Sequence, residues 1–418
     1  MTLSPAANLH GAAPSFWNRW QLLNNWLVQH QPIWRTVPFS EPVPAWCRHY
    51  PELTSWLETL TDQECDAWQD NLQAFATEAA GFVPDLGDYG ELVALPRLTT
   101  AETGQNAALP EVNAVDMPGR KRLQAGAFAA SVRPLNGPVL DWCCGKGHLA
   151  RTLAGQGADS VLGVEWNPEL VTDGNRLAQR YGDPVQLRQQ DVMAGDFAWP
   201  AAAHGVALHA CGDLHRQLLK NGSAASAPRL SISPCCYHLT GNEQYRLLSD
   251  QARNAAGALA VDRNSLRLAV QETVTAPARE RKQAAVVSAW RLGFDALQRH
   301  ARNADEYLPV PSHPSRLNSG DFEGFCVWAA QHKELRLPDK VDWQHWQSEG
   351  ERRVRQVRRH ELLRHLFRRP LELWLVLDYA VFLEEQGYQV RLGTFCDRLL
   401  TPRNLLLDAV RASELAKK

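Results

Sequence analysis

Short runs of apolar and β-branched residues recur in the middle of the chain, and each run ends in a loop that carries polar side chains. Five of these runs occupy residues 138–141, 160–165, 185–191, 205–209 and 229–233. Their last residues lie 24, 26, 18 and 24 positions apart, the length of one strand with its crossover helix. Repeated βα units predict an α/β fold with a doubly wound, mostly parallel sheet. Ligands of such sheets bind beyond the carboxyl ends of the strands, so we expect all five ends around one cleft.

Helical patterns precede this series and interrupt it. Residues 1–110 hold seven of the 15 tryptophans, spaced between polar residues as in short amphipathic helices. We expect these rings to pack a helical domain, with base stacking as the alternative use. Two late runs, 388–395 and 404–410, are predicted to complete the sheet. The expected organisation is a helical N-terminal domain at 1–110, a core at 111–275, a helical insertion at 276–369, and completion of the sheet at 370–418.

Composition places the chain among folded proteins of the cytoplasm. Hydrophobic residues make up 44% and charged residues 22% of the 418 positions, which excludes a disordered or collagen-like chain. No stretch approaches the ~18 consecutive apolar residues of a membrane span, and residues 1–10 lack the features of a secretion signal. The nine cysteines are clustered, as in Cys143-Cys144 and Cys235-Cys236, so we interpret them as reduced thiols. The net charge of -2 means that any nucleic-acid surface must be local.

The loop after the first run carries the features of a cofactor site. Gly145 and Gly147 permit a tight turn and a close approach of a ligand to the helix that follows. The pattern Gly145-x-Gly147-x-x-Ala150 also satisfies the dinucleotide fingerprint, so the glycines alone do not identify the cofactor. The acids at the next two strand ends distinguish between the two cofactors. Glu165 is placed to bind ribose hydroxyls and Asp191 an adenine amino group, a series that favours S-adenosylmethionine over NAD. The predicted cofactor contacts are Asp141, Cys143, Gly145, Gly147, Glu165, Asp191, His209 and Ala210. The alternative is that Asp141 caps the loop and that the other two acids are ordinary loop residues.

Four motifs in this order resemble the methyltransferase-like protein 25 family. They occupy residues 141–149, 208–214, 235–239 and 395–404, within a similarity that runs from about residue 117 to about residue 410. The resemblance implies a Rossmann-like class I methyltransferase that uses S-adenosylmethionine, with Gly145, Gly147 and Glu165 at the cofactor. The family is related to tRNA 2′-O-methyltransferases that act on the acceptor stem, which favours RNA as the acceptor. Cys143 departs from the pattern, because it stands where such loops carry their first glycine.

The ends of the fourth and fifth runs are predicted to face the methyl group. His209 or His238 is a candidate to take a proton from the acceptor, or else a scaffold residue. Cys235 is a candidate nucleophile, with a packing role as the alternative. Tyr237, Asp397 and Arg403 are predicted on the acceptor side. For Arg403 the alternative is a structural role in the turn into the last strand. Cysteines crowd this edge, yet adjacent pairs lack the usual spacing of zinc ligands, so we expect no metal.

An arginine-rich helix is predicted between residues 352 and 369. Its eight arginines lie in this range, its two acids are Glu351 and Glu361, and it has an apolar face. It is either a solvated surface or a phosphate-binding surface for structured RNA. The sequence therefore predicts an S-adenosylmethionine-dependent RNA methyltransferase. The alternatives are an enzyme acting on a protein or small molecule, and a non-catalytic cofactor- or RNA-binding module; the oligomeric state is not indicated.

Overall fold

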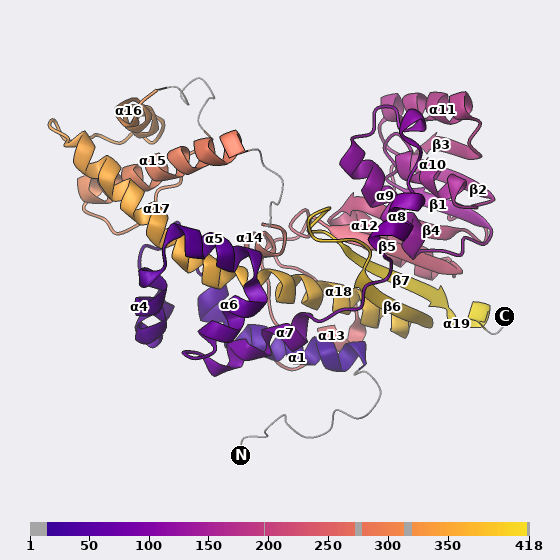
Figure 1. The fold of residues 1–418 in the computed structure, drawn as a ribbon, viewed down its shortest axis with the longest axis horizontal. Coiled ribbons are helices and arrows are strands. Elements are labelled where there is room, and N and C mark those ends of the chain that lie inside the picture. The colour runs from indigo at the N-terminus through magenta and orange to yellow at the C-terminus, as the bar shows by residue number, and fades with distance from the viewer. Residues whose placement is uncertain (1–14, 196, 272–277, 313–319, 416–418) are drawn as a thin grey trace, which may run out of the picture. The chain divides into compact units, whose positions relative to one another are not determined.

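The computed structural model describes residues 15–195, 197–271, 278–312 and 320–415 (Figure 1). It divides into two compact units. The first contains Met1–Val28, Leu92–Glu272 and Arg369–Lys418, and the second contains Gln29–Glu91 and Thr273–Arg368. This grouping differs from the four expected ranges, because the N-terminal segment is shared between the two units.

A seven-stranded sheet forms the centre of the first unit. Its order is β3-β2-β1-β4-β5-β7-β6. β1 to β5 pair in parallel, and β7 pairs antiparallel with both β5 and β6. β6 therefore runs in the same direction as the first five strands, as predicted. The strands are β1 (Pro138–Trp142), β2 (Ser160–Glu165), β3 (Val185–Gln189), β4 (His204–Cys211), β5 (Arg229–Cys235), β6 (Tyr388–Thr394) and β7 (Leu405–Arg411).

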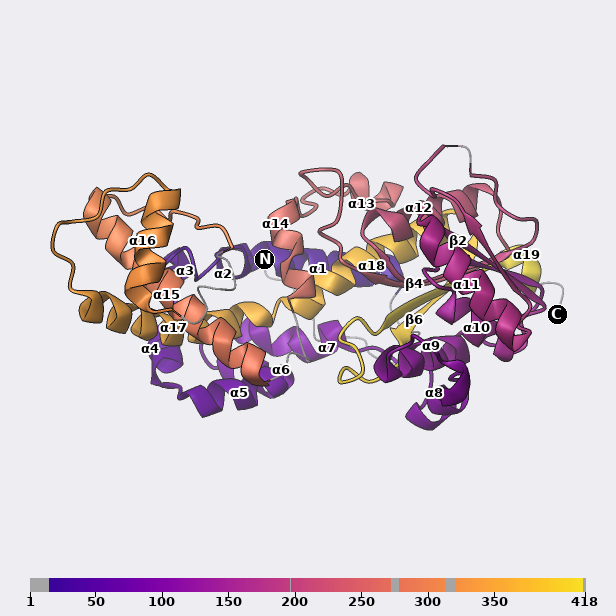
Figure 2. The same cartoon turned by 90° about the horizontal axis from the view of Figure 1, so that it is seen from above.

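Helices cover both faces of the sheet (Figure 2), as the doubly wound α/β prediction requires. The order reverses at β1, so right-handed crossovers place α10 and α11 on one face and α12 on the other. The unit's helices are α1 (Phe16–Gln29), α8 (Ala101–Asn106), α9 (Gly119–Ser131), α10 (His148–Gly155), α11 (Pro168–Tyr181), α12 (Asp213–Ala224), α13 (Asp250–Arg253), α14 (Arg263–Leu266), α18 (Arg368–Glu385) and α19 (Ala412–Leu415), with 3-10 turns at Glu111–Asn113 and Leu268–Val270.

One expected crossover helix is missing. The residues described between β3 and β4 form turns and irregular chain, so the prediction of five complete βα units is wrong there. Phe197 and Trp199 pack on Trp142 instead, with ring centroids 4.9 and 6.1 Å away. Two aromatic rings from this segment thus pack on a ring of the central strand β1, where a helix was expected.

The core of the first unit has a layer on each face of the sheet. α9 and α10 contribute Phe128 and Leu153 to an apolar cluster with Val139 and Leu406 of the strands. On α18 most side chains are buried, because the helix is enclosed by the unit. These buried layers fix the strands whose carboxyl ends form the candidate site.

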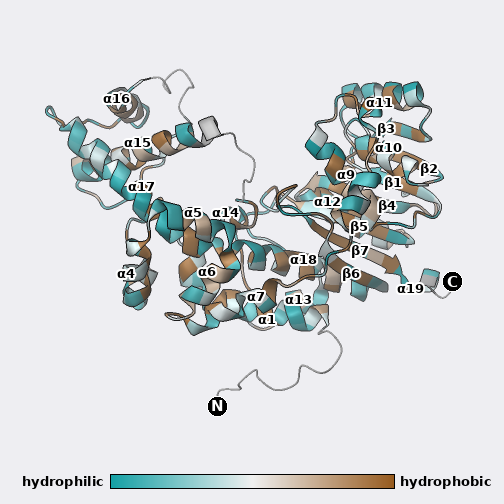
Figure 3. Cartoon of the chain, viewed as in Figure 1, coloured by the Kyte–Doolittle hydropathy of each residue, from teal (hydrophilic) through white to brown (hydrophobic). Residues whose placement is uncertain are grey.

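The second unit consists of helices. They are α2 (Gln31–Trp34), α3 (Ala45–His49), α4 (Pro51–Thr59), α5 (Asp62–Asp70), α6 (Leu72–Ala79), α7 (Tyr89–Val93), α15 (Ala278–Arg302), α16 (Phe322–His332) and α17 (Trp343–His365), with a 3-10 turn at Pro84–Asp88. Trp34 and Trp46 are buried in this unit, and hydrophobic residues lie among the polar ones along these helices (Figure 3). None of the helices described is long and apolar enough to cross a membrane.

Candidate functional site

The loop between β1 and α10 makes a tight turn at the carboxyl edge of the sheet. Cys143, Gly145 and Gly147 all have positive φ angles, of 57°, 56° and 70°. Cys143 therefore adopts the conformation of the glycine it replaces, which costs about 1–3 kcal/mol in a non-glycine residue. A Cβ added to Gly145 would meet no atom within 4 Å. The loop thus leaves its backbone open to a ligand at Gly145.

Glu165 joins this loop to the end of β2. One carboxylate oxygen accepts a hydrogen bond from the Gly145 backbone N–H at 3.1 Å. The other accepts from the Asn167 N–H, also at 3.1 Å. A carboxylate offers about four acceptor positions, so each oxygen retains one for a ligand hydroxyl.

Asp141 is turned into the protein rather than toward the loop's open side. Its carboxylate is 2% exposed and accepts from the Ala150 N–H at 3.0 Å, in the first turn of α10. Burial raises the pKa of Asp141 to about 7. This geometry matches the alternative in which Asp141 has a capping role. The N-cap residue of α10 is Gly147, which has no side chain to bond the first N–H groups, and the Asp141 carboxylate supplies that bond instead.

An acid follows β3, and one exposed apolar side chain follows each of β2 and β3 at the same edge. Asp191 lies two residues beyond the strand, is exposed, and accepts from the Met193 N–H at 2.9 Å. Trp166, which follows Glu165, is 71% exposed, and Met193 is 48% exposed. Sequence reasoning missed both. Each is a large apolar residue within two positions of a strand-end acid, and this pattern in the sequence could have indicated them.

His209 interrupts β4 with a positive φ of 67°, at a shift in the register between β4 and β5. Its Nε2 lies 2.9 Å from Oε1 of Gln124 on α9, a partner that sequence reasoning missed. Desolvation by the surrounding protein and the charge of Lys121 lower the pKa of His209, which favours a neutral ring. Ala210 is buried, and its carbonyl accepts from the His215 ring at 2.9 Å, so its side chain is turned away from a ligand.

Two residues predicted at the end of β5 lie in the interior. Tyr237 is 2% exposed, and its hydroxyl donates to the Glu372 carboxylate at 3.3 Å. Assigning Tyr237 to the acceptor was wrong, because a core phenol cannot touch a substrate. Cys235 is 3% exposed, and hydrogen bonds with its neighbouring thiols and burial hold the pKa of Cys235 well above its usual range. That environment does not suit the predicted thiolate nucleophile. His238 is half-buried, and desolvation lowers its pKa.

The loop after β6 lies at the same sheet edge, as the strand direction predicts. Ser233 of β5 donates to the Arg403 carbonyl at 3.2 Å, and Gln124 donates to the Leu400 carbonyl at 2.8 Å. The Arg403 guanidinium donates to the Val270 carbonyl within the same unit. This contact gives Arg403 a structural role, although its partner lies outside the turn into the last strand that the alternative named. Asp397 is exposed and accepts from the Leu399 N–H at 2.8 Å.

The arginines of residues 352–369 are largely engaged within the protein. Arg353 is buried and pairs with Asp295 at 2.7 Å. Arg359 and Arg364 donate to the backbone carbonyls of Leu60 and Trp34, at 2.7 and 2.9 Å. Arg355 is exposed. The apolar and arginine-rich faces of α17 therefore both serve packing in the second unit, and only part of the predicted basic surface reaches solvent.

Comparison with known proteins identifies one part of the chain. Residues 129–243 match the family model of a methyltransferase domain. The match contains β1 to β5 and therefore the Gly145 loop, Glu165 and Asp191. The matched segment is the part of the sheet whose strand ends form the candidate site.

Two curated relatives are ribosomal RNA small subunit methyltransferases H. The protein from Jannaschia sp. is 35% identical over 83 residues, which cover 20% of this chain and 25% of that protein. The protein from Cereibacter sphaeroides is 32% identical over 104 residues, or 24% of this chain and 28% of that protein. The chain thus spans about a quarter of each relative's length. A solved Pyrococcus abyssi tRNA (uracil-54, C5)-methyltransferase in complex with S-adenosyl-L-homocysteine is 18% identical, with a TM-score of 0.23, and the match covers 27% of this chain and 28% of that chain.

Proposed function

We propose that this protein transfers a methyl group from S-adenosylmethionine to RNA. The observation that carries the proposal is the Glu165 carboxylate, held by the Gly145 and Asn167 N–H groups beside an open glycine turn. The antiparallel β7 between β5 and β6 supports the choice of cofactor, because the dinucleotide-binding sheet has the order 3-2-1-4-5-6 without such a strand.

The residues at this edge fit the cofactor by their chemistry. Glu165 would accept from ribose hydroxyls, and the open backbone at Gly145 would lie against the ligand. Asp191 would accept from the adenine amino group, and the exposed Trp166 and Met193 would cover an aromatic ring. When bound, S-adenosylmethionine supplies an electrophilic methyl group.

His209 is the residue we assign to take the acceptor's proton. The Leu400 carbonyl can only accept, so the Gln124 amide nitrogen must face it and the amide oxygen must face His209. His209 Nε2 therefore carries the hydrogen, and Nδ1 keeps the lone pair. A neutral imidazole with a defined free nitrogen is suited to general-base catalysis near neutral pH. Gln124 acts as a positioning residue.

RNA is the acceptor class that the relatives favour, since both act on ribosomal RNA by name. The four motifs support the finer proposal that the chain belongs to the methyltransferase-like protein 25 family. Exposed Arg355 is available for a phosphate contact. All nine cysteines are free thiols, which supports a cytoplasmic location.

Calorimetry with the purified full chain tests the cofactor assignment. S-adenosylhomocysteine should bind with a measurable heat, and NAD should give none at the same concentrations. Binding of NAD without a response to S-adenosylhomocysteine or S-adenosylmethionine would overturn the proposal.

A further inference from the structure

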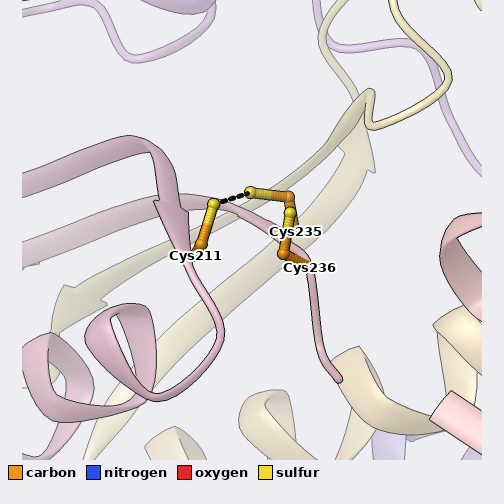
Figure 4. A group of neighbouring side chains, drawn as sticks. All are labelled: Cys211, Cys235 and Cys236. Atoms are coloured by element: carbon orange, nitrogen blue, oxygen red, sulfur yellow. Dashed lines mark hydrogen bonds between the residues drawn. The ribbon is translucent and has the colours of Figure 1, made fainter. Parts of the chain in front are cut away.

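Three cysteine side chains meet beside His209 at the ends of β4 and β5. They are Cys211, Cys235 and Cys236, and their sulfur atoms all lie within 4.8 Å of one another (Figure 4). The Sγ atoms of Cys211 and Cys235 are 3.6 Å apart. Cys235 is buried, whereas Cys211 and Cys236 are half-buried. The cluster is therefore anchored in the protein and reachable from solvent.

Two unusual backbone conformations build this cluster. The irregularity at His209, with φ of 67°, sets Cys211 opposite Cys235 in the sheet. Cys236 also has a positive φ, of 50°. Successive side chains of a regular strand point to opposite faces, so a regular β5 would separate Cys235 from Cys236. The left-handed residue removes that alternation, and such conformations in non-glycine residues are concentrated at functional sites.

We propose that Cys211, Cys235 and Cys236 bind a zinc ion through three thiolates, and that the three thiol protons are released to solvent as the metal binds. A tetrahedral zinc with Zn–S bonds of about 2.3 Å places its sulfur ligands about 3.8 Å apart. The separation of 3.6 Å between Cys211 and Cys235 matches that geometry. The other sulfur separations are within 4.8 Å and would have to shorten by about 1 Å at most. Three protein ligands leave one coordination position open, as in catalytic rather than structural zinc sites.

Three thiol side chains suit a soft divalent cation such as zinc. Within the described residues, these three thiols are the group whose ligand atoms are close enough together to share a metal ion. The sequence argued against a metal because Cys235 and Cys236 are adjacent. Spacing along the chain does not decide the matter, because the register shift of β4 sets Cys211 opposite Cys235 in the sheet.

Metal analysis of the full-length protein tests the site. Protein purified with reductant, loaded with Zn²⁺ and dialysed should retain about one zinc per chain. Replacement of zinc by Co²⁺ should give thiolate-to-cobalt charge-transfer absorption and the visible bands of a tetrahedral site. Cys211→Ser and Cys236→Ser should each weaken zinc binding at least tenfold. Cys396→Ser is the matched control, a thiol of the same unit outside the cluster, and it should retain the metal.

Thermal unfolding and binding of S-adenosylhomocysteine should be measured for every variant, so that a misfolded variant is recognised. Loss of zinc with these two readouts retained supports the site. Absence of stoichiometric zinc from the wild type, or zinc retained by both cluster variants, overturns it. A reversible loss of two titratable thiols in air, without metal binding, would also overturn it and would identify a redox pair. None of these measurements requires methyl transfer.

Discussion

Gln124 on α9 fixes the imidazole of His209 at the end of β4. Its amide oxygen lies 2.9 Å from His209 Nε2, and its amide nitrogen donates to the Leu400 carbonyl at 2.8 Å. One buried side chain thus connects a helix, the interrupted strand and the loop after β6. The arrangement selects the tautomer of His209 that leaves Nδ1 unprotonated.

Gln124→Leu should therefore impair catalysis more than cofactor binding. Without the amide, both tautomers and other ring orientations become accessible. We expect kcat to fall about tenfold to a hundredfold, less than the ~10²–10⁴-fold contribution of a general base, because the imidazole itself is retained. Single-turnover methyl transfer measures the rate, and calorimetry measures the affinity for S-adenosylhomocysteine, which should change little.

Gln124→Glu provides a second readout that a merely structural role would not give. A carboxylate beside His209 favours the charged imidazole, so the pKa of the ring should rise. The acidic limb of the pH–rate profile should move to higher pH. An unchanged profile, with the rate reduced as in Gln124→Leu, would contradict a proton-accepting role for His209.

Glu165→Ala should weaken binding of S-adenosylhomocysteine roughly tenfold or more, because a hydrogen bond to a charged group contributes about 1.5–3 kcal/mol. Titration calorimetry gives the affinity, and thermal unfolding shows whether the loop remains folded. Glu169→Ala is the matched control, since Glu169 is an exposed acid at the start of the neighbouring helix α11. Equal affinities of the two variants would remove Glu165 from the cofactor site.

The buried Asp141 should make stability depend on pH. Its pKa is raised from 3.8 to about 7 in the folded protein, so between these values the folded state holds a proton that the unfolded state has lost. The stability contributed by Asp141 is therefore greatest at low pH and falls as pH rises, by at most about 1.4 kcal/mol per pH unit. Denaturant unfolding gives the free energy of unfolding of the wild type and of Asp141→Asn. The difference between the two should change with pH between 3.8 and about 7. A difference independent of pH would contradict the raised pKa.

Two arginines of α17 should behave differently. Arg353→Met leaves Asp295 buried with only Arg299 as a counterion, 3.0 Å away, and should reduce the stability of the second unit by about 3 kcal/mol. Arg355→Ala should leave stability within about 0.5 kcal/mol and weaken RNA binding. The slope of the logarithm of RNA affinity against the logarithm of salt concentration should then become shallower by the amount that corresponds to about one phosphate contact. RNA affinity unaffected by Arg355→Ala would exclude this helix face from the RNA contact.

Much of the sheet could be predicted from sequence because strands such as β1 and β2 are short apolar runs that end at a polar loop. Glu165 and Gly145 could be proposed as cofactor contacts because both lie in local patterns, and the structure brings them within 3.1 Å of one another. His209 could be proposed as well, but its partner Gln124 lies 85 residues away and carries no local signal. Tyr237 was misplaced for a related reason. A tyrosine after a strand end is equally compatible with a cleft or a core, and only the packing of Glu372 against its hydroxyl decides between them.

The central claim is methyl transfer to RNA, and the direct measurement is transfer of labelled methyl from S-adenosylmethionine. The wild-type protein and Glu165→Ala are incubated with extract of cells that lack the protein, and the products are digested with ribonuclease or with protease. The account predicts label that ribonuclease releases and protease does not, at a much lower level with the variant. Label released only by protease, or no label from a protein that binds S-adenosylhomocysteine, would contradict it.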